Sequence, residues 1–420
     1  MNNIPQHWCP FPFSQMDFDT KGHCAACYRN HSLLGNFNDQ SLPEIWNGEQ
    51  YRTLRKKLWN GEKPTECKSC WDQESAGIKS TRQRELETYM LQHQDIIQRV
   101  EKDYNPDTGE MPLMVDEAEL RFGIICQLRC RHCNTNNSSQ WYNLANKNSE
   151  VKELFYETGD LSRHKEIRGV EMNQNAVDEI IKHLIPTIKR VRITGGEPLQ
   201  QPQHLQVIKA MQPYASDIEL EYTSNLQSLT FKGEDFAELW KPFKKVLIRI
   251  SMDGDPSMFE YKRTNANLKI VEQNIARLHE YDNVELQATC TTSIYNITRF
   301  DNIIKYFTEI GCFFHASLVQ YPDPINIKNL PKDLKDEITN NVLNINLDKS
   351  WNHSIWRKEK NVHKQIARIK EWSDYVIKYM NSDRNSIQML SKETISYVDR
   401  MDKFNGQSFK EVYPEYGKYI

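Results

Sequence analysis

The sequence predicts an α/β protein with a parallel sheet that is either open or curled into part of a barrel. Beyond Glu117, strand-like and helix-like segments alternate, a pattern typical of parallel strands joined by helices. The strand candidates are residues 119–126, 190–195, 218–224, 246–252, 284–291 and 313–320, and the helix candidates are residues 176–188, 204–211, 236–240, 268–281 and 299–310. Such a sheet places its chemistry at the carboxyl ends of its strands.

The last of these helices carries signals at both ends. Thr298, with Asp301 three residues further on, has the spacing of a capping box. Gly311 stands where a glycine commonly ends a helix. We therefore expect Thr298 to cap the start of this helix and Gly311 to mark its end.

The chain divides into four predicted segments. A small Cys-rich amino-terminal domain covers residues 1–78 and has one helical stretch at 42–58, and a connecting helix and linker cover residues 79–116. The helix of this linker, over 80–103, is broken at Asn105-Pro106-Asp107. The alternating core covers residues 117–330, and a helical carboxy-terminal extension covers residues 331–420, with helices over 332–344 and 362–380.

Composition excludes several classes of protein. The 420 residues are 38% hydrophobic, and no apolar run reaches the 18 or so residues that a membrane span requires. The first residues, MNNIPQHWCPFPF, do not resemble a secretory signal, so we expect a cytoplasmic protein. The 54 basic and 57 acidic residues nearly cancel, which gives no clear nucleic-acid footprint.

The ten cysteines are unevenly distributed. Eight lie before residue 134, and only Cys290 and Cys312 lie later. In a reducing cytosol, clustered cysteines favour metal ligands or catalytic thiols over disulfides. We expect the two late cysteines to be buried packing residues.

Three of these cysteines follow the first predicted core strand. Cys126, Cys130 and Cys133 have the spacing C-x3-C-x2-C, and three thiolates on one loop can hold three corners of a [4Fe-4S] cube while the fourth iron stays open. The alternative is a zinc site with His132 as the fourth ligand. Residues 117 to about 325 resemble the radical S-adenosylmethionine (SAM) superfamily. The resemblance implies a partial (βα)6 barrel like that of triosephosphate isomerase (TIM), in which SAM on the open iron is reductively cleaved to a 5'-deoxyadenosyl radical.

Further motifs at strand ends agree with this resemblance. Gly195, Gly196, Glu197 and Pro198 look like the family's GGEP motif, which binds the SAM amino group, although the same residues could form a simple turn. The resemblance also implies SAM-binding roles for four residues that could otherwise be helix caps or a surface arginine: Ser224, Asn225, Ser251 and Arg263.

The amino-terminal cysteines form a second pattern. The order Cys9-x12-Gly22-x4-Cys27, followed by Cys67-x2-Cys70, is similar to SPASM and twitch domains, which carry auxiliary [4Fe-4S] clusters. The cysteine count suits one twitch-like cluster, with Cys24 either spare or in place of one of the four. The alternative is a zinc ribbon made by Cys24-x2-Cys27 and Cys67-x2-Cys70.

The resemblance implies a radical SAM enzyme that abstracts hydrogen from a peptide or protein and receives its electron from flavodoxin or ferredoxin. A small-molecule substrate such as a sugar, a cofactor precursor or a nucleotide is the alternative within the same chemistry. A zinc-bearing binding protein is the alternative from another class. The sequence assigns no catalytic acid or base.

Overall fold

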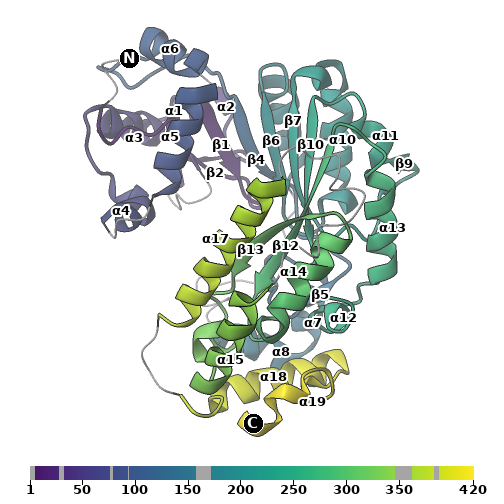
Figure 1. Cartoon of the computed structure of the whole chain (residues 1–420). Helices are drawn as coiled ribbons and strands as arrows, with labels where there is room; N and C mark the ends of the chain where they lie inside the picture. Colours follow the sequence, from purple (N-terminus) through teal and green to yellow (C-terminus); the bar gives the residue numbers. More distant parts are fainter. Residues whose placement is uncertain are drawn as a thin grey trace. The chain divides into compact units, whose positions relative to one another are not determined.

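The computed structural model describes residues 5–27, 33–75, 79–92, 94–157, 172–345, 362–382 and 387–420. It has an α/β fold with a mainly parallel central sheet (Figure 1). The chain forms two compact units, each assembled from separate stretches. The first unit is Met1–Gly123, Val170–Glu221 and Leu239–Val246, and the second is Ile124–Gly169, Tyr222–Glu238 and Leu247–Ile420.

The strands of the first unit run in the order β6-β4-β1-β2-β3. Strand β4 pairs in parallel with β6 on one side and with β1 on the other, whereas β1, β2 and β3 pair antiparallel. Their bounds are β1 Gln15–Phe18, β2 His23–Ala25, β3 Gly35–Asn36, β4 Glu117–Arg121 and β6 Arg190–Thr194. Strand β6 alternates buried Val191 and Ile193 with half-buried polar residues, so one face of it enters the core.

The helices of the first unit are short. They are α1 Phe11–Ser14, α2 Leu42–Trp46, α3 Glu49–Trp59, η1 Thr65–Cys67, α4 Lys68–Ser75, α5 Thr81–Gln92, α6 Gln94–Asp103, α9 Gln174–Glu179, η2 Ile180–Leu184, η3 Pro198–Gln200, α10 Pro202–Met211 and η4 Gln212–Asp217. Arg55 on α3 is fully buried, with its guanidinium 4.1 Å from the ring centre of Trp46 and 2.7 Å from the Pro12 carbonyl oxygen. This arginine therefore ties the helices to the chain before β1.

In the second unit, β10 (Lys245–Ser251), β12 (Val284–Thr292) and β13 (Phe313–Leu318) lie in the order β13-β12-β10, and β12 and β13 pair in parallel. The boundary between the units passes through β7 (Glu219–Ser224) and through the start of β10. Two small antiparallel pairs complete the unit: β5 Arg129–Cys130 with β11 Arg263–Thr264, and β8 Thr230–Phe231 with β9 Glu234–Asp235.

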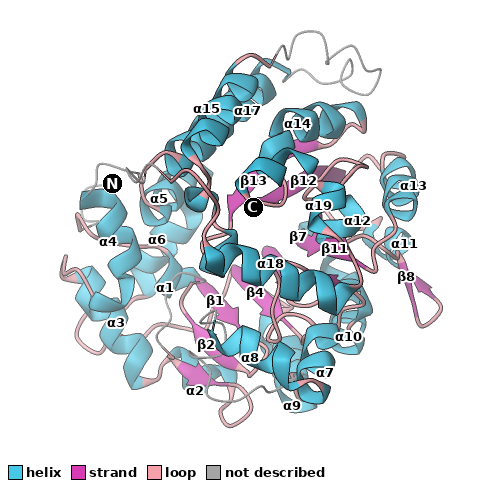
Figure 2. Ribbon diagram, turned by 90° about the horizontal axis from the view of Figure 1, so that it is seen from below, coloured by secondary structure: helices cyan, strands magenta, loops and turns pink. Residues whose placement is uncertain are grey.

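Helices α14 and α17 pack on β13, and α15 packs beside α17 (Figure 2). The helices of this unit are α7 Ser139–Lys147, α8 Ser149–Glu157, α12 Phe259–Lys262, α13 Leu268–Leu278, η5 Ile297–Arg299, α14 Phe300–Glu309, η6 Asp323–Ile325, η7 Ile327–Asn329, α15 Lys332–Leu343, α17 Val362–Met380, α18 Lys392–Asn405, α19 Phe409–Val412 and η9 Pro414–Tyr419. Helix α11, Phe236–Trp240, crosses the boundary between the units.

A strand lies in each of the six predicted strand segments. The first, β4, ends at Arg121 instead of Cys126, because the chain turns there into the cysteine loop. The predicted capping box is wrong: the Thr298 hydroxyl donates to Glu415, and no side chain caps α14. Gly311 does follow the helix in the left-handed region, at φ +74°.

One predicted helix is divided in the structure, and another is covered by two described helices. The stretch 42–58 breaks between α2 and α3 at Asn47 and Gly48, and the stretch 80–103 forms α5 and α6. The predicted break near Asn105 is confirmed, with Gly109 at φ +78°. Helix α17 has the predicted bounds, whereas α18 lies in a part of the extension where no helix was predicted.

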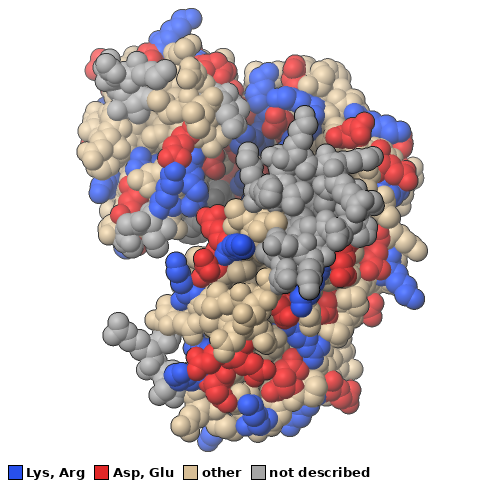
Figure 3. Space-filling view, viewed as in Figure 1, with Lys and Arg blue, Asp and Glu red and all other residues tan. Residues whose placement is uncertain are grey.

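The outer surface agrees with the balanced composition. Acidic and basic side chains are interspersed over the face seen in Figure 3. Among the described residues, no helix combines the length and the apolar character needed to cross a bilayer.

Candidate functional site

The cysteine loop is held by hydrogen bonds to the start of α7. The backbone amide of Cys126 donates to Ser139 Oγ at 3.1 Å, and Ser138 Oγ donates to the Leu128 carbonyl at 2.7 Å. The Trp141 indole donates to the Cys130 carbonyl at 2.9 Å. These three side chains therefore fix the backbone of the cysteine loop.

The three thiols of the loop lie together in a buried patch. Cys126 and Cys130 pack with Leu128, and Cys133 packs against this group. Burial raises the pKa of the Cys133 thiol well above its usual value, and the neighbouring Cys130 and Cys126 raise it further. Three thiolates at this spacing need a bound cationic group to be ionised together, so their chemistry fits an iron-sulfur cluster.

Asn225 lies beside this loop. Its Oδ1 accepts from Gln127 Nε2 at 3.2 Å, and its Nδ2 is 3.8 Å from Cys126 Sγ. Ser224 ends β7, and its hydroxyl oxygen accepts from the backbone amide of Leu226 at 3.0 Å. Leu226 adopts φ +53°, which is rare for a branched residue, so this turn holds backbone strain beside the cysteines.

Arg263 lies on the other side of the same loop. Its Nη1 is 3.4 Å from Cys130 Sγ, and its Nη2 is 2.5 Å from Asp253 Oδ2. Burial opposes ionisation of Asp253, but Arg263, Lys262 and His132 outweigh it, so the pKa of this carboxyl lies well below its usual value. A buried ionised pair therefore adjoins the second cysteine of the loop.

His132, the fourth ligand of the alternative zinc site, lies near Asp253. Its Nε2 lies 3.6 Å from Asp253 Oδ2, and burial lowers its pKa to about 3. Ser251 is half-buried at the last position of β10. The amides of the next two residues, Met252 and Asp253, both donate to the Thr289 carbonyl, which fixes the chain as it leaves the strand.

The GGEP residues follow β6 in the first unit. Gly195 adopts φ +125°, and a Cβ there would meet the Gly123 carbonyl oxygen at 2.9 Å, so this position requires glycine. The Gly196 amide donates to the same oxygen at 3.0 Å. The buried Glu197 carboxylate accepts from the Leu199 amide at 3.2 Å and so caps η3, which begins at Pro198.

Four amino-terminal cysteines lie near one another, although they come from separate elements. Cys9 precedes α1, Cys27 follows β2, and Cys67 and Cys70 lie in η1 and α4. Burial raises the pKa of Cys9 well above its usual value, and Cys27, Cys67 and Cys70 raise it further. Gly22 turns the chain between β1 and β2 at φ +76°, where a Cβ would meet Asn38 at 2.7 Å.

Cys24 is set apart from these four. It lies fully buried within β2, paired with Phe18 of β1 and Gly35 of β3. Its Sγ is 3.9 Å from the Tyr51 hydroxyl. Burial raises the pKa of Cys24, with a hydrogen bond from Tyr51 opposing and Asp17 and Asp19 adding to the rise. Its surroundings are those of a packed thiol.

Sequence reasoning missed a set of contacts that joins the cysteine loop to the extension. Arg131, fully buried, lies 3.7 Å from the ring centre of Tyr261, and its Nη2 is 2.7 Å from Asp402 Oδ1 on α18. The Tyr261 hydroxyl donates to the same oxygen at 2.7 Å. These partners lie more than 100 residues apart in the chain, so no local sequence pattern indicates the contacts between them.

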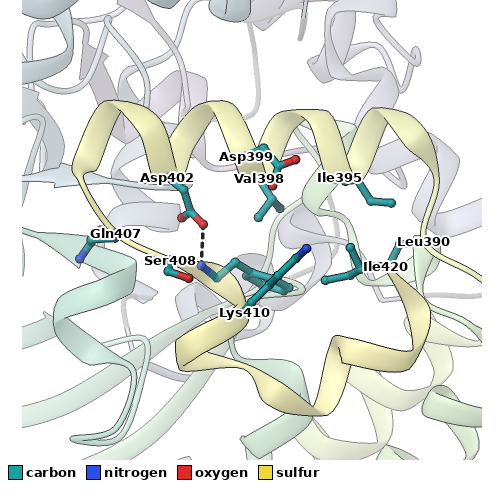
Figure 4. Close-up of a pocket in the computed structure, with 10 residues that line it drawn as sticks. Leu390, Ile395, Val398, Asp399, Asp402, Gln407, Ser408, Lys410 and Ile420 are labelled. Atoms are coloured by element: carbon teal, nitrogen blue, oxygen red, sulfur yellow. Dashed lines mark hydrogen bonds between the residues drawn. The ribbon is translucent and has the colours of Figure 1, made fainter.

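A cavity of about 250 Å³ lies beside Asp402 in the extension. Figure 4 shows this carboxylate accepting from the Phe409 backbone amide, with Gln407, Ser408 and Lys410 around it. No sequence motif indicates this cavity.

A site for a single metal ion and a site for an iron-sulfur cluster require different distances between their ligand atoms. Within the described ranges, no three His, Cys, Asp or Glu side chains are grouped so that they could hold a metal ion. In a [4Fe-4S] cube each thiolate is bound to a different iron.

Cys290 and Cys312 are both fully buried, as predicted for packing thiols.

Comparison with protein families gives two matches. Residues 9–71 match the model of the SPASM iron-sulfur cluster-binding domain, and residues 120–302 match the model of the radical SAM superfamily. No curated protein matches the chain.

Solved structures were compared as well. One similar structure is native anSMEcpe with bound AdoMet and the Kp18Cys peptide, at 15% identity and a TM-score of 0.38, covering 54% of this chain and 58% of that one. Another is SuiB of Streptococcus suis bound to the precursor peptide SuiA, at 12% identity and a TM-score of 0.37, covering 78% of this chain and 68% of that one. The chain thus spans less than two thirds of the anSMEcpe chain.

The two family matches fall on the two sets of cysteines described above. The SPASM domain precedes the radical SAM domain in this chain. The chain therefore holds a radical SAM domain preceded by a SPASM domain, and these two domains imply iron-sulfur clusters and S-adenosylmethionine as cofactors.

Proposed function

We propose that this enzyme modifies a peptide or protein by hydrogen abstraction, with a partial (βα)6 barrel as its core and a single twitch-like auxiliary cluster. The observation that carries the radical chemistry is the group of three thiols on one loop, with Cys126 and Cys130 buried and Cys133 packed against them, beside Asn225 and Arg263. When bound, the cluster and SAM supply the 5'-deoxyadenosyl radical. The chain's own residues hold and orient these cofactors.

In this proposal Cys126, Cys130 and Cys133 are the ligands of the SAM-binding cluster. The hydrogen bonds from α7 and Trp141 keep the loop in place while the sulfur atoms are ligated. Support comes from the packing of the three cysteines against one another and from the rise in the pKa of Cys133 that burial and its two neighbours cause.

The residues proposed to bind SAM are strand-end residues that follow β6, β7 and β10. They are Gly195, Gly196, Glu197, Pro198, Ser224, Asn225 and Ser251, and the family resemblance adds Arg263. Glu197 is the proposed partner of the SAM ammonium. Its carboxylate already caps η3, so it is fixed in orientation before SAM arrives.

The auxiliary cluster is proposed to have four ligands, namely Cys9, Cys27, Cys67 and Cys70. Their mutual effect on the pKa of Cys9 supports this choice. We assign Cys24 a packing role because its thiol contacts Tyr51 within the β1-β2-β3 sheet. Four thiolates leave no open iron, so this cluster would carry electrons or stabilise the domain.

The peptide substrate is proposed from the similarity of the amino-terminal cysteine pattern to the SPASM and twitch group. Flavodoxin or ferredoxin is the proposed electron donor. The test is an anaerobic assay of reconstituted enzyme with SAM, dithionite or reduced flavodoxin, and candidate peptides. We expect 5'-deoxyadenosine together with a mass change in one peptide.

The assay separates the alternatives. Formation of 5'-deoxyadenosine with a sugar, cofactor precursor or nucleotide as the only modified substrate would replace the peptide by a small molecule. Stoichiometric zinc without iron in protein prepared anaerobically would contradict the radical chemistry altogether.

A further inference from the structure

Cys130 and Arg263 are cross-strand neighbours. Strands β5 and β11 pair antiparallel with Cys130 opposite Arg263 and Arg129 opposite Thr264. The Arg131 amide continues the pairing by donating to the Lys262 carbonyl at 3.0 Å. Because directly paired residues project to the same face of a sheet, the backbone itself places a guanidinium beside a proposed cluster ligand.

The side chain of Arg263 contacts both Cys130 and Asp253. Its Nη1 lies 3.4 Å from Cys130 Sγ, within the range of a sulfur hydrogen bond, and its Nη2 contacts Asp253 Oδ2 at 2.5 Å. The Arg263 side chain is 6% exposed and that of Asp253 is 0% exposed. Charges in such a dry site act on each other more strongly than in water.

Asp253 is itself held in place from several sides. It adopts φ +58°, and its Oδ1 accepts from the Thr291 amide at 2.5 Å. His132 faces its other oxygen at 3.6 Å. A carboxylate fixed in this way can hold the guanidinium over the sulfur, because one amino group of the arginine points to each partner.

We propose that Arg263 donates a hydrogen bond to the Cys130 thiolate and thereby raises the reduction potential of the SAM-binding cluster, with Asp253 as its positioning residue. This inference rests on the proposed function, in which Cys130 is a cluster ligand. Reduction adds negative charge to the cluster, and a nearby guanidinium stabilises that charge.

This role differs from the one that family resemblance implies for Arg263, which is to pair with the SAM carboxylate. In the structure both amino groups of the guanidinium already contact Cys130 and Asp253. A measurement made without SAM therefore isolates the contact with the sulfur.

The experiment is an EPR-monitored redox titration of the full-length reconstituted enzyme without SAM. The followed signal is the one that is absent when Cys126, Cys130 and Cys133 are all replaced by Ala. We expect Arg263→Gln to lower the equilibrium constant for reduction about tenfold, which is about 59 mV for a one-electron couple. Arg263→Lys should shift it less, because it keeps the charge but loses the planar fork.

Asp253→Asn should shift the potential in the same direction as Arg263→Gln, because the arginine is no longer held over the sulfur. Arg277→Gln is the matched control, since Arg277 makes a surface ion pair with Asp235 at 2.7 Å on α13 and β9. This control should leave the potential unchanged. If Arg263→Gln does not retain the cluster, the reduction potentials of Arg263→Lys and Asp253→Asn test the proposal.

Iron analysis separates this inference from the proposed function. A wild-type protein that holds no cluster on the Cys126 loop would contradict the proposed function. An intact cluster with the same potential in wild type and Arg263→Gln would overturn the role of Arg263, even if SAM binding weakened. A shift to more positive potential in Asp253→Asn would overturn its positioning role, because Asp253 would then act only as a negative charge.

Discussion

The two sets of cysteines differ in how the chain brings them together. Cys126, Cys130 and Cys133 lie within eight consecutive residues, so one loop carries them all. The amino-terminal four are spread from Cys9 to Cys70 over several elements. The first set depends on one loop, whereas the second exists only once its unit has folded. Loss of a cluster and loss of folding should therefore be separable in the first set and coupled in the second.

The largest expected effect comes from removing the ligands of the loop. Replacing Cys126, Cys130 and Cys133 with Ala should lower the iron content from about eight to about four per chain, because one of two [4Fe-4S] clusters is lost. Reductive SAM cleavage should disappear. Iron analysis and a 5'-deoxyadenosine assay measure both outcomes. An unchanged iron content would place the cluster elsewhere.

The second prediction concerns the amino-terminal set. Replacing Cys67 and Cys70 with Ala should lower iron to about four per chain and abolish product formation while SAM cleavage stays measurable. Thermal stability should fall as well, because this set ties several elements together. Cys24→Ala is the matched control, with wild-type iron content. The separation of roles fails if SAM cleavage is lost while the loop cluster stays intact by spectroscopy.

A smaller effect is expected at the GGEP residues. Glu197→Gln removes a charge and weakens a charge-assisted hydrogen bond of about 1.5–3 kcal/mol, so SAM affinity should fall roughly 10- to 150-fold. Iron content should not change, because Glu197 is not a cluster ligand. Equilibrium binding of SAM to the reconstituted protein checks this. Wild-type affinity would show that Glu197 serves only to cap η3.

The last expected effect lies in the pH dependence of folding. Burial, with repulsion from Glu119, raises the pKa of Asp17 to about 8. The folded chain then keeps a proton that the unfolded chain releases above about pH 4, so the free energy of unfolding falls as the pH rises toward 8, by at most about 1.4 kcal/mol per unit. Asp17→Asn should remove this contribution to the dependence of the free energy of unfolding on pH. Denaturant unfolding of the wild type and of Asp17→Asn at pH 5 and pH 8 measures this difference. An equal change in the free energy of unfolding with pH in both proteins would contradict the raised pKa of Asp17.

The local features of the core were predictable from the sequence. The six strand segments stand out because they alternate with helix-like segments, and the spacing of Cys126, Cys130 and Cys133 was visible without a fold. The setting of Cys24 was not, because five amino-terminal cysteines allow several sets of four until β2 places one of them in a sheet. Thr298 illustrates a tertiary contact that overrides a local signal, since its hydroxyl bonds Glu415 instead of capping α14.

The parallel pairing of β1 with β4 has a consequence for how this chain is made and divided. Strand β1 belongs to the first 18 residues, yet its parallel partner β4 begins only at Glu117. During synthesis one edge of β1 therefore stays unpaired until about a hundred further residues have been made. Such an unpaired edge can pair with other chains. A version trimmed to the radical SAM domain would leave the matching edge of β4 bare. With both domains in one polypeptide, the pairing of β1 with β4 covers both of these edges once the chain has folded.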